Sequence, residues 1–198
     1  MTRIAVFGYG SLVDPASASA TLGRKVDEVV PARLRGWRRR FSQARDNATC
    51  EKTFARADDG TIPAWILGLN VERNADAEEA PNGGLIAVTE AELARLDVRE
   101  IRYDRVEVTA EIEPSGAGDR NRFDRVITYV AKPGHLAIEP PDGAVILRRY
   151  AEATEAAFEL FGPAAADEYR RTTLPYPAEV IDGVLVRDRI PEGNPREW

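Results

Sequence analysis

The chain has 198 residues, of which 43% are apolar and 30% are charged, as is ordinary for a globular protein of one domain. Its formal net charge of -6 argues against nucleic acid or an anionic membrane as the main partner, and no apolar run reaches membrane-spanning length. A single cysteine, Cys50, excludes an internal disulfide and favours a reducing compartment, so we expect a cytoplasmic protein. With one histidine, His135, and one cysteine, a zinc site of the common Cys/His kind is excluded.

The first predicted strand, Ile4–Phe7, leads directly into a turn that contains two glycines and a serine. Glycine adopts backbone angles that other residues avoid, and it lets a ligand approach the main chain. Successive N–H groups of such a turn can point the same way and bind an anion or a polarised carbonyl. An ordinary glycine-rich turn is the alternative, because a functional role requires a catalytic group elsewhere in the chain. The residues of this turn are Gly8, Tyr9, Gly10, Ser11 and Leu12.

A short helix or loop is predicted for Pro15–Leu22, and extended chain follows over Val26–Phe41 with breaks at Pro31 and Gly36. The extended segment carries five arginines, which form either a nucleic-acid patch or a solvated strand face. Strand alternation around Leu34 and the acidic net charge favour the strand face. The arginines are Arg33, Arg35, Arg38, Arg39 and Arg40.

Later strands and helices are predicted from apolar runs and from their periodicity. Towards the C-terminus, a helix is expected over Ala144–Phe161. Gly162-Pro163 ends this helix, and a second helix follows. The expected strands are Ala64–Val71, Gly83–Val88, Arg125–Ala131 and Val180–Val186.

The clearest helix start is the capping box Thr89-Glu90-Ala91-Glu92. Leu93 and Leu96 share one helix face, and Glu100 projects onto the same apolar stripe if the helix continues that far. Burial and the helix dipole would both raise the pKa of a carboxyl at that end, which suits a general acid or base. Alternatively, the helix stops near Arg99, and Glu100 is a surface charge or part of a structural salt bridge.

The next predicted strand, Tyr103–Glu113, alternates between apolar and polar residues. Only a couple of residues separate it from the preceding helix, so Tyr103 and Arg105 are expected to lie near Glu100. Arg105 either holds the carboxylate of Glu100 or forms a surface pair with Glu107.

Three features therefore occur in order: the Tyr-Gly-Ser turn, Glu100 at the end of a leucine-rich helix, and Tyr103-x-Arg105 at the start of a strand. The segment from Leu96 to Val106 resembles the Leu-Asp-x-x-Glu…Tyr-x-Arg signature of the γ-glutamylcyclotransferase-like family, and so does the turn. The resemblance extends over roughly residues 4–160. Two departures are Ile101, where the family often has glycine, and the tail after residue 175, which has no match.

This resemblance implies an α+β fold, a mixed and mostly antiparallel β-barrel flanked by helices. We expect a single domain over residues 1–198, with a C-terminal extension from about residue 175. By resemblance, Glu100 is the base, and the turn, Gly8 to Leu12, holds the γ-glutamyl group through its backbone. Tyr103, Arg105 and Tyr150 are further candidates for substrate contacts, and Tyr150 matches a family tyrosine by its spacing to Gly162.

The activity implied by the resemblance is that of a cofactor-independent acyltransferase or lyase. It converts a small γ-glutamyl amide or peptide into 5-oxoproline and a free amine. The substrate's α-amino group attacks its own γ-carbonyl, so the enzyme mainly holds the folded-back conformer. Glu100 would accept the ammonium proton and pass it to the leaving amine, and the N–H groups of the turn would receive the oxyanion.

Other interpretations of the turn have less support. Ser11 has no histidine near it in the sequence to act as its base, so Ser–His catalysis is disfavoured. A dinucleotide-binding turn would require a third glycine where Val13 stands, and Pro15 interrupts it. A non-catalytic module that binds a small ligand on the same fold is the alternative from a different class.

Overall fold

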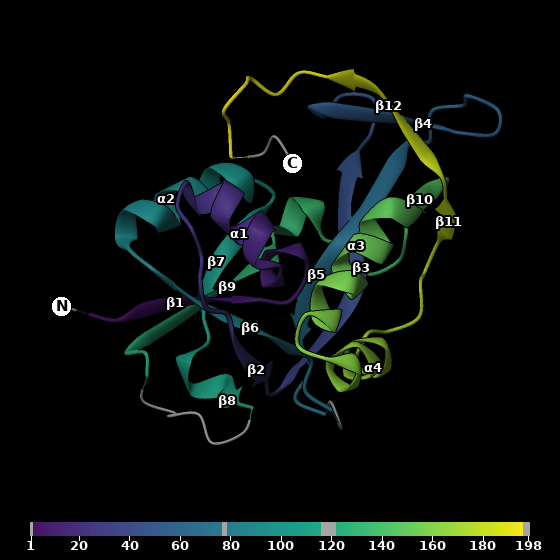
Figure 1. Cartoon of the computed structure of the whole chain (residues 1–198). Helices are drawn as coiled ribbons and strands as arrows, with labels where there is room; N and C mark the ends of the chain where they lie inside the picture. Colours follow the sequence, from purple (N-terminus) through teal and green to yellow (C-terminus); the bar gives the residue numbers. More distant parts are fainter. Residues whose placement is uncertain (1, 77–78, 116–121, 196–198) are drawn as a thin grey trace.

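The computed structural model describes residues 2–76, 79–115 and 122–195, which form a mixed α+β architecture (Figure 1). No helix within these residues is long and apolar enough to cross a membrane. The α-helices are α1 (Pro15–Leu22), α2 (Glu90–Arg99), α3 (Arg148–Glu159) and α4 (Pro163–Thr172).

The largest sheet has six strands. In spatial order they are β7 (Tyr103–Glu107), β9 (Arg125–Ala131), β1 (Ile4–Gly8), β6 (Asn82–Val88), β2 (Val30–Leu34) and β8 (Ile112–Pro114). The first strand, β1, lies inside this sheet, antiparallel to β6 and parallel to β9. All five residues of β1 are buried, so the turn that follows it starts from the interior of the protein.

The second sheet has four strands, and a separate two-stranded ribbon arches above it (Figure 1). The pair β3–β5 is antiparallel, with a bulge between Phe41 and Gln43, and β10 runs parallel to both β5 and β11. The four strands, in spatial order, are β11 (Glu179–Ile181), β10 (Ala144–Leu147), β5 (Trp65–Arg73) and β3 (Trp37–Asp46); the ribbon pairs β4 (Lys52–Arg56) with β12 (Gly183–Asp188).

Side chains, rather than a backbone ladder, connect the two larger sheets where β9 and β7 approach β5. Asn70 of β5 accepts the Ala131 N–H at 2.9 Å and donates to Ser42 Oγ at 3.2 Å. Tyr103 of β7 donates its hydroxyl to the Leu69 carbonyl of β5 at 2.8 Å. Within the described chain the strands form three separate sheets, so the α+β class is confirmed but the predicted closed barrel is not.

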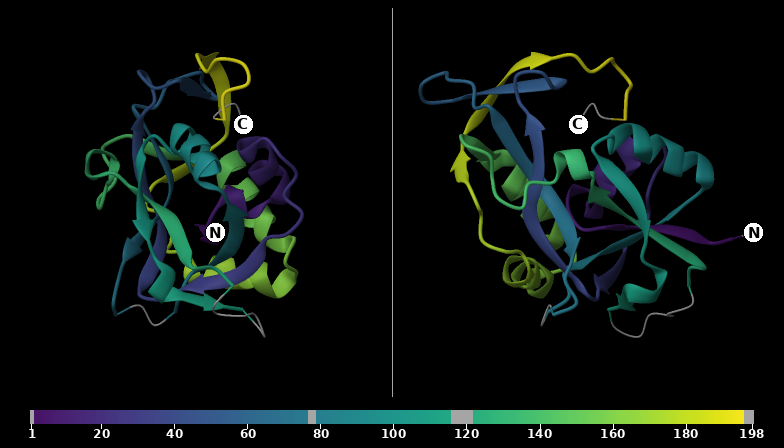
Figure 2. Two further views of the ribbon diagram at one scale, coloured as in Figure 1. Left: turned by 90° about the vertical axis from the view of Figure 1, so that its left-hand side faces the viewer. Right: turned by 180° about the vertical axis from the view of Figure 1, so that it is seen from behind.

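The helices cover these sheets in two pairs (Figures 1 and 2). Ala18 of α1 and Leu93 and Leu96 of α2 pack with Ile4 and Ile86 from one face of the six-stranded sheet. A larger core includes the other face of that sheet, the four-stranded sheet, and residues from α3 and α4. Burial of these apolar faces is the main driving force for this arrangement. Because β1 contributes side chains to both cores, its C-terminal end lies between them.

Most predicted elements are confirmed, including the N-terminal strand, the short helix Pro15–Leu22 and the strand Arg125–Ala131. The predicted strand Tyr103–Glu113 is too long, because β7 ends at Glu107 and a 3-10 helix, η2 (Thr109–Glu111), follows. Val108 is nevertheless fully buried, so the alternation of apolar residues continued past the end of the strand.

The predicted helix over Ala144–Phe161 begins four residues too early, because Ala144–Leu147 forms β10. A run of apolar, β-branched residues suits a strand that is covered on both faces and lies between two parallel neighbours. The buried residues of α3 are Ala151, Thr154, Ala157 and Phe158, whereas Ala153 is exposed. The predicted strand Val180–Val186 is also two strands, β11 and β12, and β4 was not predicted.

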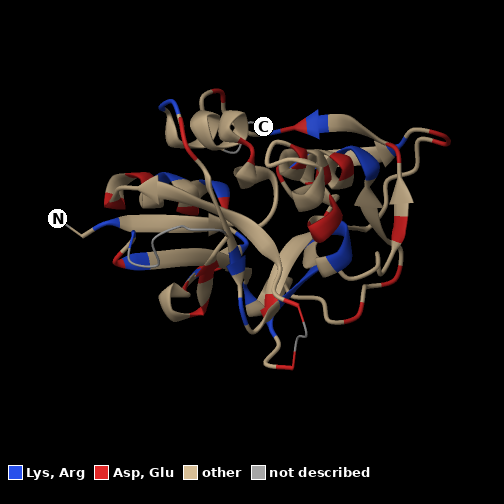
Figure 3. Cartoon of the chain, turned by 60° about the horizontal axis from the view of Figure 1, so that its bottom comes forward, with Lys and Arg blue, Asp and Glu red and all other residues tan. Residues whose placement is uncertain are grey.

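The arginine-rich segment does not form one solvated face. Its partly buried arginines form ion pairs, such as those of Arg33 with Glu168 and of Arg38 with Glu72. Arg39 is instead fully buried. Acidic and basic residues are interspersed over much of the ribbon (Figure 3). The predicted break at Pro31 is also absent, since Pro31 lies inside β2.

Candidate active site

The 8–12 turn connects β1 to a 3-10 helix, η1 (Ser11–Val13), and then to α1. Asp14 caps α1 through its side chain, which accepts the Ala16 N–H at 2.9 Å, so the chain direction after the turn is fixed. Gly10 packs closely on the second sheet: a Cβ at this position would lie 3.3 Å from Leu69 Cδ2. A larger residue at position 10 would therefore push the turn away from β5.

The peptide groups of the turn present their N–H groups away from the protein's own acceptors. The carbonyls of residues 9–11 all accept hydrogen bonds, from Arg39 Nη1 (3.3 Å), Val13 N (3.0 Å) and Asp14 N (3.2 Å) in that order. In a planar trans peptide, the N–H points opposite to the carbonyl. Within the described residues, the N–H groups of residues 10–12 donate to no backbone or side-chain acceptor. The turn thus offers three neighbouring donors to a ligand.

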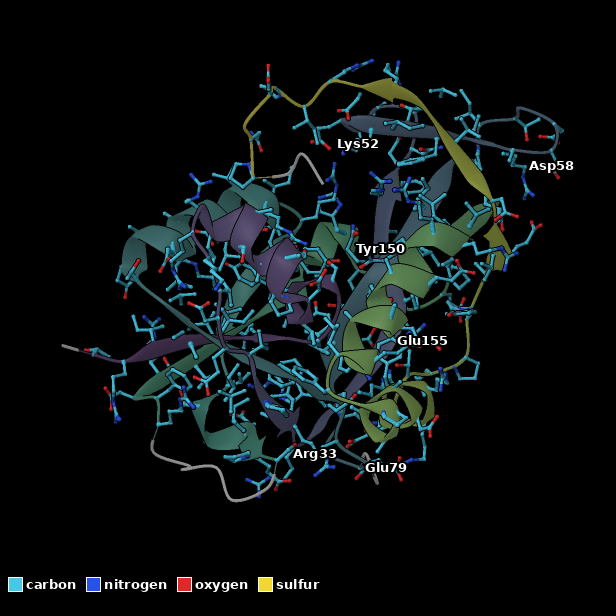
Figure 4. The ribbon with its side chains drawn as sticks, in the orientation of Figure 1. Arg33, Lys52, Asp58, Glu79, Tyr150 and Glu155 are labelled. Atoms are coloured by element: carbon cyan, nitrogen blue, oxygen red, sulfur yellow. The ribbon has the colours of Figure 1, made fainter. Side chains whose placement is uncertain are left out.

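Three tyrosine hydroxyls lie beside the turn and hold buried backbone groups. Tyr9 donates to the Tyr129 carbonyl at 2.7 Å. Both polar backbone atoms of Leu69 are bound by tyrosines: its carbonyl accepts from Tyr103 at 2.8 Å, and its N–H donates to Tyr150 at 3.4 Å. Figure 4 labels Tyr150 near the start of α3, where the helix lies close to β5. These bonds connect the turn to β9, and they connect β5 to β7 and to α3.

The electrostatic environment places the carboxylate of Glu100 in the same region. Burial raises the pKa of the Tyr9, Tyr103 and Tyr150 hydroxyls above the ordinary value, and the charge of Glu100 contributes to the increase at each. These hydroxyls stay protonated at neutral pH and can act as hydrogen-bond donors. One carboxylate thus contributes to the electrostatic environment of all three tyrosines.

The helix α2 ends one residue before Glu100, which is its C-cap with φ −94° and ψ 40°. The alternative in which the helix stops near Arg99 is thus the observed one, yet Glu100 is not a surface charge. Its side chain is 18% exposed, and Oε1 lies 3.1 Å from Arg99 Nε. Glu100 also connects α2 to β7, because its carbonyl accepts the Tyr103 N–H at 2.8 Å.

Arg99 is a residue of this region that sequence reasoning missed. Its side chain is 3% exposed, and its guanidinium contacts Glu100 and also donates to Ser11 Oγ at 3.0 Å. The same guanidinium binds the hydroxyls of Ser17 and Thr21 on α1. The spacing Leu93-x-x-Leu96-x-x-Arg99 was the available signal, since residues three apart share a helix face.

Arg105 is the exception among the predicted site residues. It is exposed, and its Nε donates to Asp97 Oδ1 at 2.6 Å, so the expected contact with Glu100 or Glu107 is wrong. Glu107 pairs instead with Arg125 at 3.1 Å. The reason is geometric. The connection between α2 and β7 is short, so the chain turns back, and Arg105, two residues into β7, lies beside Asp97, two residues before the end of α2. The structure brings together Gly8, Tyr9, Gly10, Ser11, Leu12, Glu100, Tyr103 and Tyr150.

Two surface hollows described in the structure lie elsewhere. One is bordered by the 24–28 segment and β6, and the other by β11 and the end of β4. Their charged residues are mostly paired with each other, as Arg56 is with Glu179. In the described part of the chain, no three His, Cys, Asp or Glu side chains are grouped so that they could hold a metal ion.

Comparison with known proteins identifies the fold. No protein-family profile and no curated protein sequence matches the chain. A solved structure titled gamma-glutamyl cyclotransferase is 13% identical, with a TM-score of 0.56 over 90% of this chain and 93% of that chain. An uncharacterized protein from Homo sapiens is also 13% identical, with a TM-score of 0.58 over 91% and 94% of the two chains.

A third structure, YkqA from Bacillus subtilis, is 19% identical with a TM-score of 0.55, and it matches 86% of this chain. The chain spans only 54% of the length of YkqA. At such identities the likeness defines an architecture and not an activity. The chain has the γ-glutamyl cyclotransferase-like fold, as the resemblance of its motifs predicted.

Proposed function

We propose that the protein is a cofactor-independent γ-glutamyl cyclotransferase, which releases 5-oxoproline and a free amine from a γ-glutamyl amide or peptide. One observation carries the proposal: the Arg99 guanidinium connects the Glu100 carboxylate to the Ser11 hydroxyl of the 8–12 turn, whose N–H groups at residues 10–12 have no acceptor within the described residues. Cyclisation of a γ-glutamyl group needs these two elements, a base for the amine and donors for an oxyanion.

The reaction begins with substrate held so that its α-nitrogen approaches its own γ-carbon. Glu100 accepts a proton from the ammonium, and the freed electron pair forms the new C–N bond. The negative charge that develops on the carbonyl oxygen is received by the N–H groups of residues 10–12. One such donor contributes about 3–4 kcal/mol in the transition state of comparable reactions.

Collapse of the tetrahedral intermediate breaks the original amide C–N bond. Glu100 returns the proton to the leaving nitrogen and passes on a second proton from the new ring nitrogen, so the products are the neutral lactam and a protonated amine, and the carboxylate is regenerated. Tyr103 and Tyr150 bind the backbone of Leu69, whose side chain lies beside Gly10. These bonds help to hold β5 in place against the turn. Their neutral hydroxyls add no charge that would oppose the developing oxyanion.

The test is a screen of γ-glutamyl dipeptides, γ-glutamyl amines and glutathione for 5-oxoproline release by the purified protein. We expect turnover of at least one of these classes without added metal or nucleotide. Thermal stabilisation by a γ-glutamyl compound without any 5-oxoproline would instead support the non-catalytic binding module. Neither turnover nor stabilisation by any compound would contradict both assignments.

A further inference from the structure

Arg99 differs from most arginines of this chain because its charged group is buried. The arginines of the surface form ion pairs in which both partners reach solvent, as in Arg3–Asp124 and Arg122–Glu28. Such pairs contribute little to stability. The Arg99 side chain is 3% exposed, and a charge buried to that degree is compensated by hydrogen bonds from its Nη atoms and by an ion pair between Nε and Glu100 Oε1.

The contacts of Arg99 reach three parts of the molecule from one rigid group. It donates to Ser11 Oγ in the turn, to Ser17 Oγ and Thr21 Oγ1 on α1, and it pairs with Glu100 at the end of α2. The guanidinium is planar and holds its donors in a fixed fork. The distance between the turn and the carboxylate is therefore set by one group of constant shape.

The pairing of two adjacent residues needs an explanation, because neighbours in a helix do not face each other. Glu100 is the C-cap of α2, with φ −94° and ψ 40°, and its carboxylate oxygen Oε1 lies 3.1 Å from Arg99 Nε. The end of α2 at this residue is thus part of the geometry that brings base and guanidinium together.

We propose that Arg99 is a positioning residue that couples the Glu100 carboxylate to the 8–12 turn; this rests on the proposed cyclotransferase function. It holds one oxygen of Glu100 and the Ser11 hydroxyl on the same guanidinium. The base and the oxyanion donors therefore keep a constant separation as the proton moves. Misplacement by about 1 Å can reduce an enzymatic rate about 100-fold, so such a coupling acts on kcat.

Arg95, one turn earlier on α2, provides a matched control. It also connects α2 to α1, because its Nε donates to the Thr21 carbonyl at 3.1 Å. Among its contacts in the described chain, none involves Glu100 or the 8–12 turn. Arg95→Met therefore loosens the same helix pair without touching the proposed coupling.

The experiment compares Arg99→Met, Arg99→Lys and Arg95→Met in 5-oxoproline release. We expect Arg99→Met to lower kcat about 100-fold with KM within about threefold of the parent, because ground-state binding is retained. Arg99→Lys retains the charge and should recover about tenfold of that loss, and Arg95→Met should stay within about threefold of the parent kcat. An Arg99→Met protein with the parental kcat, or equal losses in both methionine variants, would overturn the proposal.

A second readout separates this inference from the proposed function. Amide hydrogen exchange of Val13 and Asp14, whose N–H groups bond to the Gly10 and Ser11 carbonyls, should become faster in the Arg99 variants and stay unchanged in Arg95→Met. If the parent releases no 5-oxoproline but the exchange result holds, the proposed function fails while the coupling stands. If exchange at these two amides is the same in all variants, the coupling is wrong. Should Arg99→Met not fold, Ser11→Ala removes the same link from the side of the turn and must reproduce the loss of kcat.

Discussion

Two buried arginines contact the 8–12 turn, and they are held in different ways. Arg39 of β3 is fully buried, and its hydrogen bonds within the described chain all go to neutral groups, among them the carbonyls of Tyr9 and Asn82. Its guanidinium also lies 4.1 Å from the centre of the Tyr169 ring. Arg99 is buried as well, but it adds a carboxylate to its neutral partners.

This difference suggests different roles: Arg39 stabilises the fold, whereas Arg99 lies beside the proposed catalytic carboxylate. Arg39 connects β3 to the turn, to β6 and to the end of α4, and none of the groups that it binds titrates near neutral pH. Arg99 binds Glu100, the group that we propose exchanges a proton during turnover. Removing Arg39 should therefore reduce stability, whereas removing Arg99 should mainly reduce the catalytic rate.

The largest expected effect is on the stability of Arg39→Met. Several buried acceptors lose their donor at once, and we expect the free energy of unfolding to fall by about 3–5 kcal/mol. Urea unfolding with an unchanged m value measures this loss. Arg38→Met is the control, because Arg38 lies next in the strand but pairs with Glu72 near the surface; it should cost below about 1 kcal/mol. Equal losses in the two variants would contradict the structural role of Arg39.

A matched pair of threonines sharpens the comparison. Thr21 Oγ1 accepts from Arg99, and Thr172 Oγ1 accepts from Arg39 at 3.0 Å. Replacing either by valine keeps the shape and removes one acceptor, so each change should lower stability by about 1 kcal/mol. Only Thr21→Val should also lower kcat, which steady-state assays with a γ-glutamyl substrate would show. A drop in kcat for Thr172→Val alone would reverse the assignment of the two arginines.

At alkaline pH we expect a smaller effect on stability, in which the buried tyrosines and Arg39 contribute with opposite signs. The raised pKa values of Tyr9, Tyr103 and Tyr150 mean that, above about pH 10, the folded state keeps protons that the unfolded chain loses, so stability falls. Burial lowers the pKa of Arg39 to about 10, so between about pH 10 and 12.5 that group makes stability rise with pH. Urea midpoints from pH 8 to 11 should fall more steeply in Arg39→Met than in the parent. A parallel decline in both proteins would be evidence against this opposing contribution.

The smallest expected effect concerns Arg3, an exposed arginine that we compare with the two buried ones. Its hydrogen bonds lower the pKa of Asp124 to about 2, so this pair contributes stability above the ordinary aspartate pKa of 3.8, and the contribution is lost as pH falls toward 2. Asp124→Asn should therefore show a slightly flatter decline in stability between those pH values. An identical acid dependence would mean that the pair is screened by solvent.

Local patterns predicted the elements that carry the chemistry but not how they meet. The turn after β1 and the capping box of α2 follow from residue types at fixed spacing, and the structure contains both. The predicted barrel is not confirmed: the contact between the two larger sheets depends on side chains such as Asn70 and Tyr103, which no periodicity reveals. The resemblance also grouped Arg105 with Glu100, although helix and strand geometry directs Arg105 to Asp97.

Arg99 shows why burial of a charge is difficult to predict. A charged residue at i+3 from Leu96 reads as the polar edge of an amphipathic helix, since arginine is rarely fully buried. Its burial depends on hydroxyls from α1, which is about 80 residues distant in sequence, and on the turn of β1. Only the tertiary structure places these partners around it.

The most direct measurement is 5-oxoproline release by Glu100→Gln, compared with the parent on a substrate found in the screen. Glutamine keeps the size and the hydrogen-bonding capacity of the side chain but cannot accept the ammonium proton. We predict that kcat falls by at least about 100-fold while the thermal stability of the variant stays close to that of the parent. Release of 5-oxoproline at the parental rate would contradict the assignment of Glu100 as the base and, with it, the proposed chemistry of the site.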